Sequence, residues 1–255
     1  MARDPFGAGV SGPPRVLVPG AALGPGGAVA LPEDEVRHLR VSRVAPGSEV
    51  VLLDGHGRRA TARIGPSGRE AVVGELLPTK GEPARRVSVL LGAGEVARIE
   101  WAVEKGTECG AARFVLLSCA RSQRAHVSAA ASRIARLRRI AAEAVKQCDR
   151  SVVPEVVAPE TPERVLAAWR GPLLVARPGA PPIGTGRAGR GDAAVAIGPE
   201  GGFDETEERL LDAADVDEVR SDANDHGLSV DALDLADVGQ NAQLVQNLRQ
   251  MLDVP

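Results

Sequence analysis

The sequence predicts an α/β protein built from two parts, a small β-rich barrel followed by a parallel sheet flanked by helices. Short β-compatible runs separated by Gly/Pro turns fill residues 15–77, a spacing typical of small barrels. From residue 87 to residue 211, apolar runs alternate with segments of helical spacing, which indicates parallel strands covered by helices. An abrupt change of composition after Leu211 separates a third segment, an acidic tail at residues 212–255, from both parts.

The first part is predicted to contain five short strands and one helix. The strands are expected at Arg15–Val18, Ala28–Leu31, Glu49–Asp54, Arg58–Ile64 and Ala71–Leu77. The helix is expected from Glu33 to Val44, because Pro32 suits a helix start and Pro46-Gly47 stops it. Residues 1–14 are expected to be a flexible N-terminus, and residues 78–86, which contain two prolines, a linker.

The second part is predicted to alternate strands and helices. Its strands are expected at Val87–Leu91, Phe114–Cys119, Val152–Val157, Pro172–Arg177 and Ala193–Gly198. Its helices are expected at Arg98–Cys109, Ala129–Cys148 and Pro162–Trp169, with one more after Asp204. The longest of these helices carries apolar residues at three-to-four spacing along one face. A Pro/Gly-rich loop is expected at Pro178–Gly191.

Charge is distributed unevenly along the chain. The net charge is −3, yet residues 212–255 carry −8 and the body before them +5. Of the 31 basic residues 28 are arginines, whose planar guanidinium pairs bidentately with phosphate. Three widely spaced cysteines argue against a disulfide framework and against a metal site. Without a long apolar run or a secretory signal, the protein is expected in the cytoplasm, with no membrane contact.

The main candidate site is the glycine-rich loop Ile197-Gly198-Pro199-Glu200-Gly201-Gly202. Its glycines permit close approach of the backbone to a ligand, and it follows a parallel strand, where open α/β sheets hold their ligands. Asp204 and Glu207 form the pattern of a capping box for the next helix. The loop lacks the Lys-Ser/Thr of a phosphate-binding P-loop and the dinucleotide fingerprint. Taken alone, it is also compatible with an ordinary strand-to-helix turn.

Four segments of the chain together carry a resemblance. They are His38–Arg43 with the turns Pro46-Gly47 and Leu53-Asp54-Gly55; Trp101–Gly110; Ile140–Cys148 with Asp149-Arg150 and Val153-Pro154; and Ile197–Phe203. In this order they resemble the RsmE family, bacterial methyltransferases of the knotted SPOUT class that act on N3 of a uridine in 16S ribosomal RNA. The last segment is the most specific, and the resemblance covers about Arg15 to Leu211.

The resemblance implies a PUA-like, RNA-binding β-barrel at residues 15–77 and a SPOUT α/β trefoil-knot methyltransferase domain at residues 87–211. It implies S-adenosyl-L-methionine as the cofactor, 16S rRNA of the small ribosomal subunit as the partner, and a homodimer. The implied cofactor-binding residues are Leu174, Val175, Ala176, Ile197, Gly198, Pro199, Glu200, Gly201 and Gly202. The candidate RNA-binding residues, each also compatible with a solvated surface, are Arg40, Arg43, Arg121 and Arg124.

Three further polar residues, Lys105, Glu108 and Gln147, lie in the matched segments. Lys105 and Glu108 are three residues apart on a predicted helix, so a simple ion pair between them is an alternative to a functional role. Methyl transfer to N3 requires that a base or water remove the imide proton. The sequence assigns no residue to this task, so the catalytic residues are left unknown.

The tail at residues 212–255 departs from the family. There the family has a Leu-Gly-x-Arg-Ile-Leu-Arg-Thr-Glu-Thr-Ala segment that completes the knot and the cofactor pocket, and this chain has nothing similar. The sequence therefore does not decide whether the knot closes, and it is compatible with three functions. These are an active 16S rRNA methyltransferase, an RNA-binding member of the same family with impaired catalysis, and an unrelated nucleotide-binding α/β protein.

Overall fold

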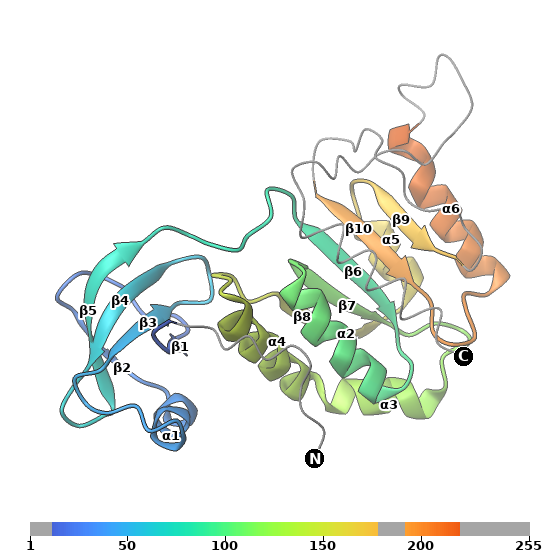
Figure 1. The fold of residues 1–255 in the computed structure, drawn as a ribbon. Helices are drawn as coiled ribbons and strands as arrows, with labels where there is room; N and C mark the ends of the chain where they lie inside the picture. Colours follow the sequence, from blue (N-terminus) through green and yellow to red (C-terminus); the bar gives the residue numbers. More distant parts are fainter. Residues whose placement is uncertain (1–11, 178–191, 220–255) are drawn as a thin grey trace. The chain divides into compact units, whose positions relative to one another are not determined.

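The computed structural model describes residues 12–177 and 192–219 of the chain (Figure 1). The chain divides into two compact units, the first formed by residues 1–81 with Val145–Val152 and the second by residues 82–144 and 153–255. Three predicted segments lie wholly or mostly outside the described residues: the loop at Pro178–Gly191, the N-terminus expected to be flexible, and the acidic tail beyond Val219. The knot closure, which depends on that tail, lies outside them as well.

The first unit contains a mixed five-stranded sheet that forms a half-barrel, in agreement with the small β-rich barrel predicted from the sequence. The strands are β1 (Arg15–Leu17), β2 (Ala28–Ala30), β3 (Glu49–Leu53), β4 (Arg59–Ile64) and β5 (Glu70–Leu77). Their order is β1-β3-β4-β5-β2, and only the β1–β3 pair is parallel. Alternate side chains such as Val50, Leu52 and Ala62 form one buried core with Val36 and Leu39 of helix α1 (Glu33–Val41).

Helix α1 ends three residues earlier than the sequence predicted. The N–H of Val44 donates to the carbonyl of Leu39 at 2.9 Å, and the N–H of Arg43 donates to that of Arg40 at 3.0 Å. These two bonds make a Schellman motif, which places Arg43 in the left-handed region at φ 56°. Glycine usually occupies this position, and with arginine there the sequence carried no stop signal before Pro46-Gly47.

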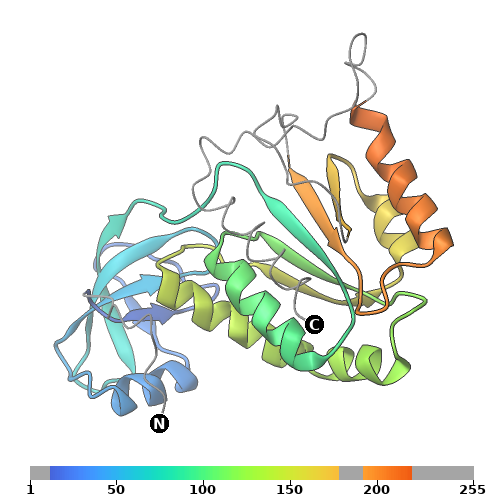
Figure 2. The ribbon, with the colours of Figure 1, turned by 45° about the vertical axis from the view of Figure 1, so that its right-hand side comes forward.

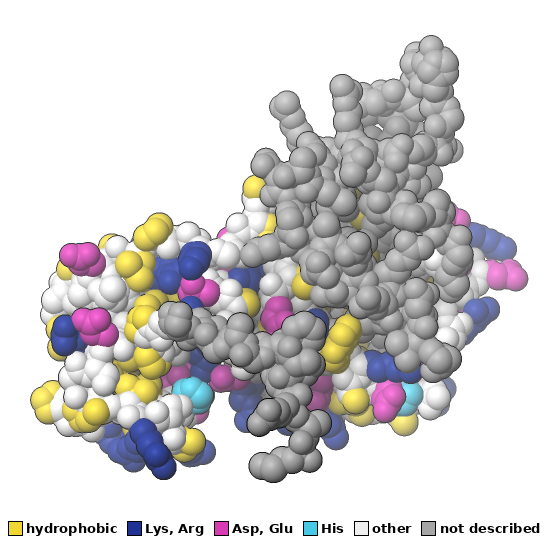
Figure 3. Space-filling model, viewed as in Figure 1, with side chains coloured by type: hydrophobic (Ala, Val, Ile, Leu, Met, Phe, Trp, Pro, Cys, Tyr) yellow, Lys and Arg dark blue, Asp and Glu magenta, His cyan; other side chains and the backbone are white. Residues whose placement is uncertain are grey.

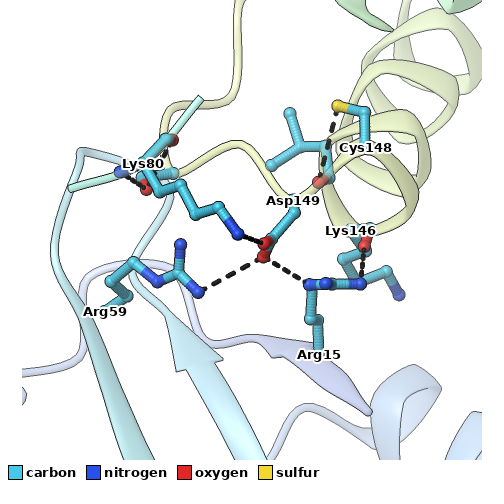
Figure 4. A network of polar contacts seen from close by, with 8 residues as sticks. Arg15, Arg59, Lys80, Lys146, Cys148 and Asp149 are labelled. Atoms are coloured by element: carbon cyan, nitrogen blue, oxygen red, sulfur yellow. Dashed lines mark hydrogen bonds and ion pairs between the residues drawn. The ribbon is translucent and has the colours of Figure 1, made fainter. Parts of the chain in front are cut away.

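A partly buried network of charges joins the segment Val145–Val152 to the sheet of the first unit (Figure 4). Asp149 accepts from Arg15 at 2.6 Å, from Arg59 at 3.2 Å and from Lys80 at 2.5 Å. Burial works to raise the pKa of Asp149, but the hydrogen bonds from Lys80 and Arg15 and the charge of Arg59 hold it below its ordinary value. The carboxylate is therefore ionised at neutral pH and balances part of the surrounding positive charge.

Two more contacts hold this segment in the first unit. Lys146 and Glu35 form a buried ion pair at 2.8 Å. The Ser151 hydroxyl accepts from the N–H of Lys80 at 2.8 Å and donates to its carbonyl at 3.0 Å. Nothing in the sequence pattern indicated that residues so far from the barrel would complete it.

The second unit contains a five-stranded sheet in which every pair is parallel, as predicted (Figure 2). Its strands are β6 (Val87–Gly92), β7 (Arg113–Leu117), β8 (Glu155–Glu160), β9 (Leu173–Ala176) and β10 (Ala193–Ile197), in the order β8-β7-β6-β10-β9. Its helices are α2 (Val96–Glu108), α3 (Arg124–Ser132), α4 (Ile134–Cys148), α5 (Pro162–Ala168) and α6 (Glu205–Val219).

The helices cover both faces of the parallel sheet. One core packs α2, α3 and α4 against side chains such as Phe114 and Val195, and the other packs α5 and α6 against Leu90 and Ala196. The strands are accordingly almost continuously apolar, and all five residues of β10 are buried. This arrangement leaves the carboxyl ends of β6, β7, β9 and β10 along one edge.

The structure corrects two predicted elements of this unit. The helix expected at Ala129–Cys148 is two helices, α3 and α4, because the N–H of Arg133 donates to the carbonyl of Ala130 in a tight turn. No Gly or Pro marks that break. The strand expected at Val152–Val157 begins only at Glu155, since Pro154 has no N–H to donate.

Candidate functional site

The predicted loop leaves the carboxyl end of β10, near the middle of the parallel sheet. The N–H of Gly202 donates to the carbonyl of Pro199 at 2.8 Å, which closes a tight turn. Gly202 has φ +71°, a conformation that side chains rarely adopt. Gly198 and Gly202 also lie close to each other, since a Cβ on Gly198 would be 3.3 Å from the backbone of Gly202. The loop thus folds on itself and presents backbone rather than side chains.

The capping box predicted at the start of α6 is confirmed. The Asp204 carboxylate accepts from the N–H of Glu207 at 2.8 Å, and one oxygen of Glu207 accepts from the N–H of Asp204 at 2.9 Å. The other oxygen of the buried Glu207 accepts from the N–H of Ala120, after β7, at 2.7 Å. Glu207 therefore fixes both the start of α6 and the loop that follows β7.

The loop after β6 approaches the glycine loop from one side. A Cβ on Gly92 would lie 2.5 Å from Cδ of Pro199 and 2.7 Å from the carbonyl carbon of Gly198. A Cβ on Gly94 would lie 2.5 Å from the carboxylate of Glu200. This carboxylate accepts from the N–H of Glu95 at 3.1 Å. A side chain at Gly92 would therefore displace the backbone of the glycine loop, and one at Gly94 would displace the Glu200 carboxylate.

Glu200 is held in its ionised form. Burial works to raise the pKa of this carboxyl, but hydrogen bonds from the backbone N–H groups of Glu95 and of Glu200 itself outweigh it. The charges of Arg98 and His126 act in the same direction, so the pKa of Glu200 lies below its ordinary value. The group is a fixed acceptor for backbone donors of the site.

The loop after β7 contacts the glycine loop from the other side. The Arg121 guanidinium donates to the carbonyl of Gly201 at 3.1 Å, and a Cβ on Gly201 would lie 3.2 Å from Cβ of Arg121. Burial, with the nearby charge of Glu207, raises the pKa of Cys119 in the same loop to about 12. Cys119 is therefore a neutral thiol at physiological pH and is excluded as a thiolate nucleophile.

The predicted wall formed by β9 lies directly beside β10. Ala176 pairs with Ile197 and Val175 with Ala196, and the side chains of Leu174, Val175 and Ala176 are half-buried. Just beyond the strand, Arg177 donates to Glu208 at 2.6 Å and to Asp212 at 2.6 Å. The structure therefore brings the predicted aliphatic residues of β9 next to the end of the strand that carries the loop.

The remaining sequence candidates lie in other places. Lys105 contacts Glu108 at 2.9 Å on α2, the ion pair foreseen as an alternative. Arg124 is the exposed first residue of α3, and Gln147 is exposed in the segment that belongs to the first unit. Arg40 and Arg43 are exposed around the end of α1, where Figure 3 shows Lys and Arg side chains gathered on the first unit.

Two residues that shape this site, Gly92 and Gly94, were not predicted from the sequence, nor was the second contact of Glu207. The two glycines of Gly92-Ala93-Gly94, directly after an apolar strand, are a signal that could have identified the first two. No local signal marks the Glu207 contact, because its partner Ala120 is 87 positions away.

The part of the chain that the structure describes shows neither a metal-binding cluster nor a membrane-spanning helix. No three His, Cys, Asp or Glu side chains lie close enough to hold a metal ion within residues 12–177 and 192–214. Among the described helices none combines the length and the hydropathy needed to cross a membrane.

Comparisons with known proteins agree with this geometry. The sequence model of an RNA methyltransferase domain matches residues 81–220, more than half of the chain, and that of an RNA methyltransferase PUA domain matches residues 31–77. A crystal structure described as ribosomal RNA small subunit methyltransferase E from Neisseria gonorrhoeae, bound to S-adenosyl methionine, superposes with a TM-score of 0.71. It is 28% identical, over 80% of this chain and 86% of that chain.

Two more distant structures share the fold. A putative methyltransferase from Legionella pneumophila is 21% identical, with a TM-score of 0.71 over 92% of this chain and 98% of its own. A probable rRNA-methyltransferase from Porphyromonas gingivalis is 24% identical, with a TM-score of 0.65 over 93% of this chain and 98% of its own. With a matching PUA domain, a matching catalytic domain and the parallel sheet described above, the chain belongs to the RNA methyltransferase family and is of the RsmE type.

Proposed function

We propose that this protein transfers a methyl group from S-adenosyl-L-methionine to N3 of a uridine in 16S rRNA of the small ribosomal subunit. The observation that carries the proposal is the fixed glycine loop Gly198–Gly202, held between the carboxyl ends of parallel strands inside the matched methyltransferase domain. The relative from Neisseria gonorrhoeae, described as a small subunit rRNA methyltransferase with S-adenosyl methionine bound, supports the same assignment.

The residues present fit this cofactor. Gly198, Gly201 and Gly202 carry no side chains that would cover the loop backbone, and Gly201 is exposed. The loop backbone, including Pro199 and Glu200, would bind the polar groups of the cofactor, and the aliphatic side chains of Leu174, Val175, Ala176 and Ile197 would pack on its apolar surfaces. When bound, the cofactor supplies an electrophilic methyl group on a sulfonium centre.

The chain's own contribution to the reaction is positioning and loss of the N3 proton. Glu200 is ionised, but its carboxylate already accepts a backbone hydrogen bond from Glu95. It is therefore a structural acceptor in this proposal, and the proton acceptor is left unassigned.

The RNA contacts belong to the same proposal. The barrel at residues 15–77 is the RNA-binding domain, linked through residues 78–86 to the methyltransferase domain, and Arg40, Arg43, Arg121 and Arg124 contact phosphates. All four arginines are exposed. Affinity for 16S rRNA should fall steeply as salt rises, because phosphate contacts release counterions. A flat salt dependence would contradict these contacts.

Methylation of small ribosomal subunits that lack the modification tests the proposal. Incubation with labelled S-adenosyl-L-methionine should yield 3-methyluridine, detected by mass spectrometry of nucleosides from 16S rRNA. Gly201→Arg should abolish cofactor binding, because its Cβ would already lie 3.2 Å from Cβ of Arg121 and the rest of the side chain would cover the exposed backbone of the loop. Gly24→Arg is the matched control, since nothing lies within 4 Å of its Cβ position. Methylation of another atom or another RNA would refute the proposal.

A second candidate, an RNA-binding member of the family with impaired catalysis, is favoured by one observation. The tail at residues 212–255 has no counterpart of the segment with which the family completes its pocket. Calorimetry that detects no binding of S-adenosylhomocysteine, with retained affinity for 16S rRNA, would establish this alternative. Light scattering tests the proposed homodimer in the same samples.

A further inference from the structure

The loop after β7 is attached by one hydrogen bond to the glycine loop and by another to helix α6, which follows it. The N–H of Ala120 donates to Glu207 at 2.7 Å, and the next residue, Arg121, donates to the carbonyl of Gly201 at 3.1 Å. Because Gly201 has no Cβ, the Arg121 side chain lies directly against the loop backbone. A displacement of Arg121 therefore acts on the glycine loop itself.

Glu207 makes this attachment firm. Its side chain is buried, and each of its carboxylate oxygens accepts from a backbone N–H, one of Ala120 and one of Asp204. Only a carboxylate offers two acceptors to two donors in this geometry. The backbone that carries Arg121 is thereby fixed relative to the loop that carries Gly201.

The Arg121 guanidinium has unused hydrogen-bonding capacity. It offers five N–H donors, of which one bond, to Gly201, is seen. Its side chain is exposed, and no carboxylate of the described residues pairs with it. Arg136 and Arg177 differ, since their charges are balanced by Glu100 and by Glu208 and Asp212. Arg121 is therefore a cation beside the glycine loop, with donors left for an anion.

We infer that Arg121 couples RNA binding to cofactor binding. One N–H of its guanidinium donates to the carbonyl of Gly201, and the remaining N–H groups bind an RNA phosphate. A phosphate that orders the guanidinium also orders the loop, and an ordered loop binds cofactor better. Coupling of this kind is reciprocal, and it commonly amounts to about fivefold or more in affinity. This inference rests on the proposed function, because it requires that the loop bind cofactor and that the protein bind RNA.

Filter binding of labelled 16S rRNA, with and without saturating S-adenosylhomocysteine, measures the coupling without turnover. For the unaltered protein, the unreactive product should tighten RNA binding by about fivefold or more. In Arg121→Gln the ratio of the two affinities should fall to about one. Arg121→Lys should keep much of the RNA affinity yet lose the coupling, because a single ammonium lacks the planar fork that reaches two acceptors.

Arg124→Gln is the matched control, since Arg124 is also exposed and makes no hydrogen bond to the glycine loop among the described contacts. It should weaken RNA binding by the same factor with and without S-adenosylhomocysteine, leaving the ratio unchanged. Thermal melts of all variants serve as the control for folding. Substitution of an exposed arginine is not expected to lower the melting temperature appreciably.

Calorimetry of S-adenosylhomocysteine with the protein alone separates the two proposals. If this ligand does not bind, the proposed function fails and the coupling with it. If it binds, but RNA affinity is the same with and without it, the coupling alone is refuted. A ratio that survives in both Arg121→Gln and Arg121→Lys also refutes the coupling through this side chain.

Discussion

Each unit of the molecule contains a network built on one carboxylate, and the two networks use opposite kinds of donor. In the first unit Asp149 is surrounded by the charged side chains of Arg15, Arg59 and Lys80 (Figure 4). In the second unit Glu207 accepts from two backbone N–H groups, of Ala120 and Asp204. The first network fastens a distant segment to a sheet, and the second fixes two loops at the edge of a site.

The difference reflects what each network has to hold. Long charged side chains reach across several ångströms and tolerate adjustment, but salt screens their attraction where they are exposed, as for Lys80. Backbone N–H groups have no such freedom, so a loop bonded through them is held in one geometry. Because these backbone donors are neutral, they add no net positive charge beside the glycine loop that would compete with the charged groups of a ligand.

The largest expected effect is that of Asp149→Asn. Asparagine tolerates the left-handed backbone at this position, φ 63°, but it leaves three cations without their anion. The first unit should lose about 2–4 kcal/mol of stability, and the loss should shrink in about 1 M salt, where the Debye length is about 3 Å. Hydrogen exchange of peptides from β3 and β4 measures this, because both tryptophans, Trp101 and Trp169, belong to the second unit.

The exposed pair Arg63–Glu49 in the same unit provides the control, with side chains 67% and 68% exposed. Arg63→Gln should cost less than about 1 kcal/mol. A salt-independent loss in Asp149→Asn, or a loss no larger than that of Arg63→Gln, would contradict the assigned role of the charge network.

The pH dependence of this effect has a defined direction. The pKa of Asp149 in the folded protein lies below its unfolded value of 3.8. Its carboxylate therefore contributes stability above pH 3.8, and this contribution is lost as the pH falls through the folded pKa. The stability difference between the protein and Asp149→Asn should stay constant from about pH 8 to pH 5 and close at lower pH. A difference that narrows near neutral pH would show that another group is responsible.

Glu207→Gln should have the next largest effect, and it tests the backbone network. The amide of glutamine places an N–H₂ against one of the two backbone N–H donors, so the second unit should lose about 1–3 kcal/mol. Urea unfolding followed by tryptophan fluorescence reports on this unit. Because the lost bonds join a buried group to neutral donors, the loss should be nearly the same at low and high salt. If the stability loss of Glu207→Gln depended strongly on salt, the two networks would not differ in the way proposed.

Gly92→Ala tests the packing of the loop after β6 against the glycine loop, and its clearest effect is expected on ligand binding. Its Cβ would lie 2.5 Å from Cδ of Pro199 and closer still to the Pro199 nitrogen, so the glycine loop has to shift. Such crowding commonly costs about 1–3 kcal/mol, and affinity for S-adenosylhomocysteine should fall about tenfold, equivalent to about 1.4 kcal/mol. Gly24→Ala, where the Cβ meets nothing within 4 Å, is the control. Unchanged affinity in Gly92→Ala would mean that the loop tolerates movement.

Much of the fold followed from local sequence patterns. Alternating β-compatible runs predicted β3 and β4 to within one residue, and the Asp204–Glu207 spacing predicted the capping box. The patterns failed where the chain bends without a glycine or proline, as at Arg133, and where arginine takes the usual glycine position, as at Arg43. In both cases backbone hydrogen bonds, rather than residue propensity, end the helix.

The sequence by itself determined most of the elements, the parallel character of the second sheet and the position of the glycine loop, because each depends on neighbours within about one turn or strand. The tertiary structure alone decided which groups surround that loop. Glu200 meets Glu95 across 105 positions, Ala120 meets Glu207 across 87, and Arg121 meets Gly201 across 80. It also decided that Val145–Val152 complete the first unit. Parallel strands bring their carboxyl ends to one edge whatever lies between them in sequence, so these contacts leave no local pattern to recognise.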